Sequence, residues 1–155
     1  ARRFVVVHLQ EAIRRQPVVV SPDTTLARAA KTMEEQGVGA LVVVEAGKPT
    51  GIVTDRDITV RATARRYPPD ARVDSVMSTD LVALSPDDEI DRAFALFEEH
   101  AIRRIPLVDE DGRLVGLVSA DDLMMNVSGD LVRLVRPITG QTLFGQHEPT
   151  LPVVP

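Results

Sequence analysis

Near the middle of the chain lies Gly51-Ile52-Val53-Thr54-Asp55-Arg56-Asp57-Ile58, and the pattern returns as Gly116-Leu117-Val118-Ser119-Ala120-Asp121-Asp122-Leu123. In each stretch a short apolar run leads into a polar junction, which predicts a strand followed by the start of a helix. A hydroxyl residue and, three positions later, an aspartate occupy the same place in both stretches. This duplication predicts a chain built from two similar units.

The residues around the first stretch predict the other elements of one unit. We expect a short strand within 17–20, a buried strand over the apolar run 40–44, and a turn over 46–49. Between the first two strands a helix is predicted by an apolar stripe, formed by Leu26, Ala29, Ala30 and Met33. We expect Asp23 to cap this helix and Gly37 to end it in a left-handed conformation. The predicted order is strand, helix, strand, strand, helix.

The same order returns in the second half of the chain. Ser21-Pro22-Asp23 matches Ser85-Pro86-Asp87, 64 residues later, and small leading helices over 9–13 and 73–77 also correspond. The second hairpin turn contains one extra residue, so the offset between Asp57 and Asp122 is 65 residues. We therefore expect repeats over 7–61 and 73–128, a polar linker over 62–72, and a helix end with an extended tail over 129–155.

Repetition has a physical consequence for the way the units pack. A unit of roughly 60 residues is only marginally stable alone, because it buries too little of its surface. Each repeat should therefore cover its apolar face with the other repeat. Two similar units packed in this way are related by a pseudo-two-fold axis, and the arrangement creates two related clefts between them.

Composition narrows the class of protein. Hydrophobic residues make up 44% of the chain and aromatic residues 3%, so the core is expected to be aliphatic. The net charge of −5 disfavours a duplex nucleic-acid partner, which requires a basic surface. The chain has no cysteine, hence no thiolate chemistry. Its apolar runs are far shorter than the ~18 residues of a membrane span, so we expect a cytoplasmic protein with no membrane partner.

With both repeats placed, the chain resembles a tandem pair of CBS domains, also called a Bateman module. The matching segments are 21–26, 39–43 and 51–58 in the first repeat and 85–87, 103–108 and 116–122 in the second. The resemblance implies an α/β (α+β) fold of two β-α-β-β-α repeats packed with pseudo-two-fold symmetry. It also implies a homodimer and regulatory binding of AMP, ADP or ATP or, in some members, S-adenosylmethionine or NAD.

In this family the hydroxyl of the duplicated motif lies near phosphate or ribose, and the aspartate binds the ribose diol. The residue types suit these roles, because a carboxylate has two acceptor oxygens for two vicinal hydroxyls. A helix start also favours an anion. The same spacing is, however, that of an ordinary capping box. The two roles are compatible, since a cap uses few of the available lone pairs.

Basic residues supply the candidate phosphate contacts. Arg103 and Arg104 precede Ile105-Pro106, where the family places phosphate-binding side chains, whereas a charged pair at a strand end is the ordinary alternative. At the junctions, Arg56 would help to hold a phosphate and Asp121 would repel one, so we expect unequal sites. The candidate ligand-binding residues are Thr54, Arg56, Asp57, Arg103, Arg104, Pro106, Ser119 and Asp122.

The leading interpretation is a non-enzymatic module that senses adenine nucleotides, and thus cellular energy, and regulates an unidentified protein. The alternative is a structural or dimerisation module without nucleotide. An enzyme is disfavoured because the sequence has no nucleophile motif and its histidines, His8, His100 and His147, have no metal-ligand spacing. Single-stranded nucleic-acid binding is disfavoured by the scarcity of aromatic residues. No cofactor is expected beyond the regulatory ligand.

Overall fold

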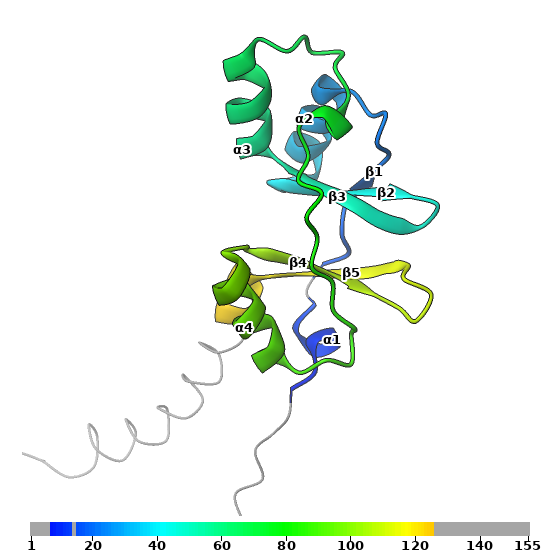
Figure 1. Ribbon diagram of the computed structural model, residues 1–155, viewed down its shortest axis with the longest axis vertical. Helices are drawn as coiled ribbons and strands as arrows, with labels where there is room; N and C mark the ends of the chain where they lie inside the picture. Colours follow the sequence, from blue (N-terminus) through cyan, green and yellow to red (C-terminus); the bar gives the residue numbers. More distant parts are fainter. Residues whose placement is uncertain (1–6, 14, 126–155) are drawn as a thin grey trace, which may run out of the picture.

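The computed structural model describes residues 7–13 and 15–125 of the chain, which form two similar units, one above the other (Figure 1). The upper unit contains β1 (Val19–Val20), α2 (Leu26–Gln36), β2 (Ala40–Glu45), β3 (Lys48–Thr54) and α3 (Asp55–Asp57). After α3 the helical path continues as a π-helical turn, Ile58–Ala62, and a 3-10 turn, Thr63–Arg65. The lower unit contains α1 (Leu9–Ala12), α4 (Ile90–His100), β4 (Arg104–Val108) and β5 (Leu114–Ser119). These elements confirm the predicted α+β fold.

The first sheet has the order β1-β2-β3, with β1 parallel and β3 antiparallel to β2. Gly37 ends α2 with a φ of 62°, as predicted. The prediction that Asp23 caps α2 is wrong, because the helix begins at Leu26 and Thr25 is its cap, with Thr25 Oγ1 accepting from the Arg28 N–H at 3.2 Å. The predicted turn over 46–49 is also too long, since β3 begins at Lys48.

The second sheet repeats this arrangement with a shorter first strand. β4 and β5 are antiparallel, and the counterpart of β1 is a single parallel bridge between Leu84 and Leu107. Its register is the same as that of Val20 with Val43 in the first sheet. Residues 120–125 are helical and follow β5 as α3 follows β3. The predictions for 126–128 and for the tail over 129–155 lie outside the described residues.

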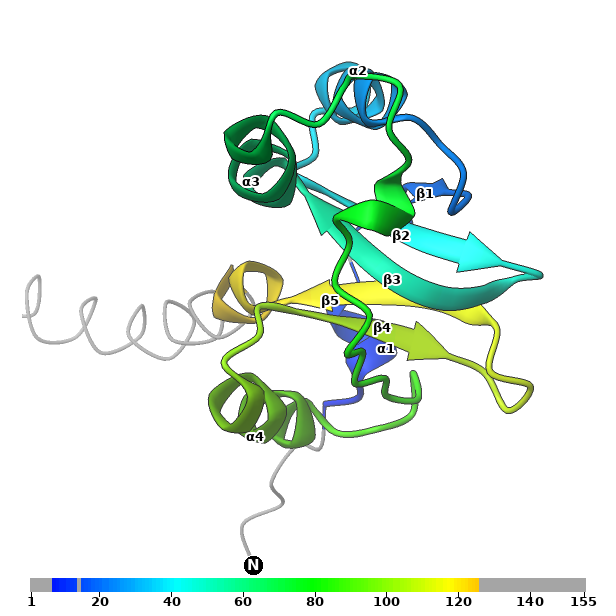
Figure 2. The ribbon, with the colours of Figure 1, turned by 45° about the horizontal axis from the view of Figure 1, so that its top comes forward.

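The leading segments of the two repeats are exchanged between the packed units. The first core contains Val73 and Val76, from the start of the second repeat, together with Leu26, Ala29, Met33, Leu41, Val43, Val53 and Ala62. The second core contains Leu9 and Ala12, from the start of the first repeat, together with Leu84, Ala93, Ile105, Leu107, Val118 and Leu123. Figure 2 shows α1 beneath the β4–β5 sheet, far from α2. The residues 62 and 71–77, predicted as linker and second repeat, therefore complete the first core.

Backbone hydrogen bonds hold both exchanged segments in the same way. Leu26 N–H donates to the Ala71 carbonyl at 2.8 Å, and Ile90 N–H donates to the Val7 carbonyl at 3.1 Å. Bridges between Thr25 and Arg72 and between His8 and Glu89 continue the two contacts. Because each pair of bonds is the 64-residue counterpart of the other, the exchange obeys the pseudo-two-fold symmetry.

The two sheets face each other in the middle of the molecule, and the longer helices lie on the outer sides (Figures 1 and 2). Successive strand residues point to opposite faces. Ile105 and Leu107 belong to the second core, so Pro106 between them points toward the first unit. Val42 and Pro106 hold equivalent positions, are fully buried and belong to neither core. These two side chains therefore mark the centre of the contact between the repeats.

Candidate functional site

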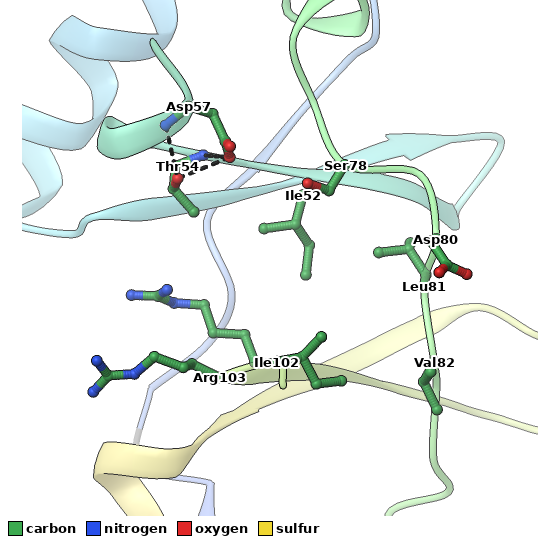
Figure 3. Close-up of a pocket in the computed structure, with 10 residues that line it drawn as sticks. Ile52, Thr54, Asp57, Ser78, Asp80, Leu81, Val82, Ile102 and Arg103 are labelled. Carbon is green, nitrogen blue, oxygen red and sulfur yellow. Dashed lines mark hydrogen bonds between the residues drawn. The ribbon is translucent and has the colours of Figure 1, made fainter. Parts of the chain in front are cut away.

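Two clefts lie between the repeats. The first cleft takes Ile52, Thr54 and Asp57 from the upper unit and Ile102, Arg103 and Arg104 from the lower unit. The connecting segment 78–82 forms its third wall, with Ser78, Asp80, Leu81 and Val82 (Figure 3). Ser78 is fixed there by a two-bond bridge to Ile52, with N–H to carbonyl distances of 2.9 and 3.0 Å. The first cleft therefore needs residues of both repeats.

The second cleft is the pseudo-symmetric counterpart of the first. It is lined by Leu117, Ser119 and Asp122 in place of Ile52, Thr54 and Asp57, and by Val38, Gly39 and Ala40 in place of Ile102, Arg103 and Arg104. Gln16, Pro17 and Val18 replace Asp80, Leu81 and Val82. Two further residues, Arg15 and Arg104, complete the lining. The two related clefts expected from the repeat are thus present.

Strand pairing sets the position of each polar motif. Thr54, at the end of β3, lies opposite Ala40 at the start of β2, and Ser119, at the end of β5, lies opposite Arg104 at the start of β4. At the residue after each hydroxyl, the chain leaves the sheet. The Asp55 N–H donates to the Gly39 carbonyl at 3.1 Å, and the Ala120 N–H donates to the Arg103 carbonyl at 2.9 Å. A hydroxyl and a carboxylate therefore line each cleft.

Thr54 and Asp57 form a complete capping box. Oδ2 of Asp57 accepts from the Thr54 N–H at 2.9 Å and from the Thr54 hydroxyl at 2.8 Å, while Thr54 Oγ1 accepts from the Asp57 N–H at 3.1 Å. Figure 3 shows these bonds on the upper side of the cleft. Oδ1 of Asp57 lies 3.5 Å from Nε of Arg61. The capping role considered for this motif is therefore confirmed, and Oδ1 keeps acceptor capacity.

Ser119 and Asp122 repeat this geometry in the second cleft. Oδ2 of Asp122 accepts from the Ser119 N–H at 3.3 Å and from its hydroxyl at 2.6 Å, and Ser119 Oγ accepts from the Asp122 N–H at 3.1 Å. In both motifs the hydroxyl proton is directed to the aspartate. Each hydroxyl oxygen is therefore left to act as an acceptor rather than as a donor toward other groups.

The predicted basic residues occupy unequal positions. Arg104 lines both clefts, whereas Arg103 lines the first and donates from Nη2 to Oδ1 of Asp121 at 2.9 Å. Arg56 is exposed and lines neither cleft, so it does not accompany Thr54 and Asp57. Pro106 is buried between the sheets and also lines neither. Arg56 and Asp121 were expected to make the charges of the two clefts unequal. The difference arises instead from Arg103, Arg104 and Asp121.

Several cleft residues were missing from the predicted set. The apolar walls come from the segments 81–82 and 17–18, and the polar rims include Asp80, Arg15 and Gln16. None of these residues carries a recognisable motif. The signal that would have found them is their equivalence at the 64-residue offset, because both segments precede the first strand of a repeat.

The clefts combine the features of a small-molecule site. Their accessible volumes are about 140 and 180 Å³, so each cleft is a small recess that is open to solvent. Each pairs an aliphatic wall with a carboxylate and a guanidinium. Within the described part of the chain, no three acidic or histidine side chains gather to hold a metal ion. The same residues contain no helix that is long and apolar enough to cross a membrane.

Comparison with known proteins agrees with this geometry. The family model of the CBS domain matches residues 9–62 and 73–129. The chain is 41% identical over 118 residues to the CBS domain-containing protein YhcV of Bacillus subtilis, covering 76% of this chain and 84% of YhcV. It is 30% identical over 115 residues to inosine-5'-monophosphate dehydrogenase of Methanocaldococcus jannaschii, but this match covers 74% of the chain and only 22% of the dehydrogenase.

A solved structure shows the same fold with a ligand. The CBS domain protein PAE2072 from Pyrobaculum aerophilum, complexed with AMP, superposes with a TM-score of 0.70 at 27% sequence identity. The match covers 76% of this chain and 90% of PAE2072. Together with the duplicated motif and the paired clefts, these matches show that the chain belongs to the CBS domain family, as a tandem pair.

Proposed function

We propose that the chain is a non-enzymatic regulatory module whose ligand is an adenine nucleotide held between the repeats. The observation that carries this proposal is the meeting of Asp57, from one repeat, with Arg104, from the other, across a cleft with an aliphatic wall. The AMP complex of the related PAE2072 supports the choice of ligand. AMP, ADP and ATP are the first candidates, and S-adenosylmethionine and NAD are the alternatives.

Each part of such a ligand has a matching surface in the first cleft. The adenine packs on Ile52, Ile102 and Leu81, because flat aromatic ligands bury well against aliphatic side chains. The ribose hydroxyls donate to Oδ1 of Asp57, the oxygen that the capping box leaves available. The phosphate lies against Arg104 and, when its ion pair opens, Arg103. The second cleft repeats the scheme with Asp122 and Ser119.

A ligand placed in this way would couple the orientation of the repeats to nucleotide concentration. A ligand that contacts both repeats stabilises the arrangement to which it binds by mass action, and a partner that prefers the same arrangement then binds more tightly. Competition between AMP and ATP for the clefts would make the module an energy sensor. We place the protein in the cytoplasm as a homodimer that acts on an unidentified protein.

A second candidate is a structural module that binds no nucleotide. One observation favours it, because the hydroxyl and carboxylate of each motif satisfy one another without a ligand. In that case the clefts are solvent-filled gaps, and the motifs only cap the helices that follow them.

Calorimetric titration separates the candidates. The protein is titrated with AMP, ADP, ATP, S-adenosylmethionine and NAD, and the ligand is recovered and analysed for turnover. Saturable heat with unchanged ligand supports the regulatory module. Absence of binding to all five supports the structural module, and a reaction product would contradict both.

A further inference from the structure

We propose that the two clefts compete for a single guanidinium, that of Arg104, so that a phosphorylated ligand in one cleft weakens the binding of a second in the other. This inference rests on the proposed function and adds the coupling between its two sites. Arg104 contributes to the lining of both clefts. Its counterpart in the first repeat, Ala40, lines only the second cleft.

The strand geometry explains why one side chain reaches both sites. Ile105 and Leu107 point into the second core, so Arg104 and Pro106 point from β4 toward the first repeat. Pro106 lies at the centre of the contact between the sheets, fully buried. Arg104 stands beside this centre, opposite Ser119 of the second cleft. A long side chain at that point extends to either side of the pseudo-two-fold axis.

The guanidinium of Arg104 is available to a ligand. Within residues 7–13 and 15–125 it makes no hydrogen bond or ion pair, in contrast to Arg61, Arg72 and Arg103. A guanidinium binds one phosphate best, because its planar fork matches two oxygens of the same group. Two phosphates drawn to the same fork would also repel each other. Simultaneous full use by both clefts is therefore unfavourable.

The other charged residues of the two linings decide which cleft binds a phosphorylated ligand first and thereby takes up Arg104. In the first cleft the other cation, Arg103, is held by Asp121, and two carboxylates, Asp57 and Asp80, line the wall. Among the described residues that line the second cleft, Arg15 is a further cation and Asp122 is the only carboxylate. We therefore expect the first phosphorylated ligand to take Arg104 into the second cleft. A second such ligand then meets a first cleft whose available cation has been lost.

The experiment compares the intact protein with variants in which one cleft is obstructed. Gln16 and Asp80 are exposed, equivalent rim residues of the second and first clefts. Gln16→Trp and Asp80→Trp each place a bulky ring in one cleft without disturbing a core. AMP titrations of these single-cleft variants define the two intrinsic affinities, and circular dichroism checks that both variants are folded. Amide signals of Thr54 and Ser119 in the unsubstituted protein report each cleft separately, independently of either variant.

Competition predicts that the second AMP molecule binds the unsubstituted protein roughly tenfold or more weakly than AMP binds the weaker of the two single-cleft variants. A difference of this size is expected because the second AMP lacks one charged hydrogen-bonding group. The gap disappears in Arg104→Gln and with adenosine, which has no phosphate. A wild-type isotherm equal to the sum of the two single-cleft isotherms overturns the competition and leaves nucleotide binding intact. Absence of binding to AMP and adenosine in every variant overturns the proposed function as well.

Discussion

Asp57 and Arg104 line the same cleft although they belong to different repeats. Asp57 follows β3 of the first unit, and Arg104 opens β4 of the second. In the first cleft, the carboxylate and the guanidinium that the proposed ligand needs therefore come from different repeats. Ligand affinity should therefore depend on how the repeats are packed, which is the property that a regulatory module requires.

Because the leading segments are exchanged, a substitution near the N-terminus should destabilise the second unit more than the first. Leu9 is fully buried in the second core, so Leu9→Ala should lower the free energy of unfolding by about 2–5 kcal/mol. Amide hydrogen exchange should show the larger loss of protection in β4 and β5. Val73→Ala is the matched control, since Val73 lies in the first core and should loosen β2 and β3. Loss of protection in the opposite pattern would contradict the exchange.

The equivalent ends of α2 and α4 carry different residues, so substitutions at the two positions should change stability in opposite directions. Gly37 and Ala101 end α2 and α4 in left-handed conformations, with φ of 62° and 51°. A side chain in this region costs about 1–2 kcal/mol. Ala101→Gly should therefore stabilise the protein and Gly37→Ala should destabilise it, each by about 1 kcal/mol. Chemical denaturation of the two variants measures both changes, and two changes of the same sign would contradict the assignment.

The ion pair between Arg103 and Asp121 predicts a gain in affinity when it is broken. Both side chains are mostly exposed, 69% and 63%, so the pair adds little stability. Asp121→Asn should leave the unfolding midpoint nearly unchanged and release Arg103 to a phosphate in the first cleft. AMP affinity measured by calorimetry should rise about threefold to tenfold. Adenosine is the control ligand, and an equal rise for adenosine would show that Arg103 is not the cause.

Gly51 sets the distance between β3 and the connecting segment 78–82. A methyl group at this position would collide with Met77 and would lie 3.1 Å from the backbone oxygen of Ser78. Gly51→Ala should lower stability by about 1–3 kcal/mol and weaken ligand binding in the first cleft, because the segment that carries Ser78 must move. Denaturation and AMP titration measure the two effects.

Gly116→Ala is the matched control for Gly51→Ala. Its methyl group would meet mainly the end of the Ile13 side chain, at 2.7 Å, which can rotate away. We expect a smaller loss of stability and unchanged binding in the first cleft. Equal effects of the two substitutions would contradict the role assigned to the connecting segment.

Much of the fold was predictable because it depends on local patterns. The apolar stripe of α2, the continuous apolar run of β2 and the duplicated strand–helix junction each have a short-range signature. The exchange of Leu9 and Val73 between the cores has no short-range signature in the sequence. Because both repeats begin with similar apolar segments, packing on either unit satisfies the same sequence pattern, and only the tertiary structure distinguishes the two arrangements.

The candidate site was predictable to a similar extent. The duplicated motif predicts Thr54, Asp57, Ser119 and Asp122, and the structure places these residues in the linings of two related clefts. The sequence pattern does not show that Arg104 lines both clefts, since this depends on the position of β4 beside the pseudo-two-fold axis. Nor does it place Arg56 on the exposed side, because a charged residue after a strand suits either location.

The most direct test of nucleotide binding between the repeats is a heteronuclear NMR titration of the labelled protein with AMP. Binding between the repeats predicts saturable shifts of the amide signals of Thr54, Asp57, Arg104, Ser119 and Asp122. Signals around a separate hollow lined by Ser21, Asp23, Glu45 and Arg72 should stay unchanged. Absence of shifts at millimolar AMP, or shifts confined to residues outside both clefts, would contradict it.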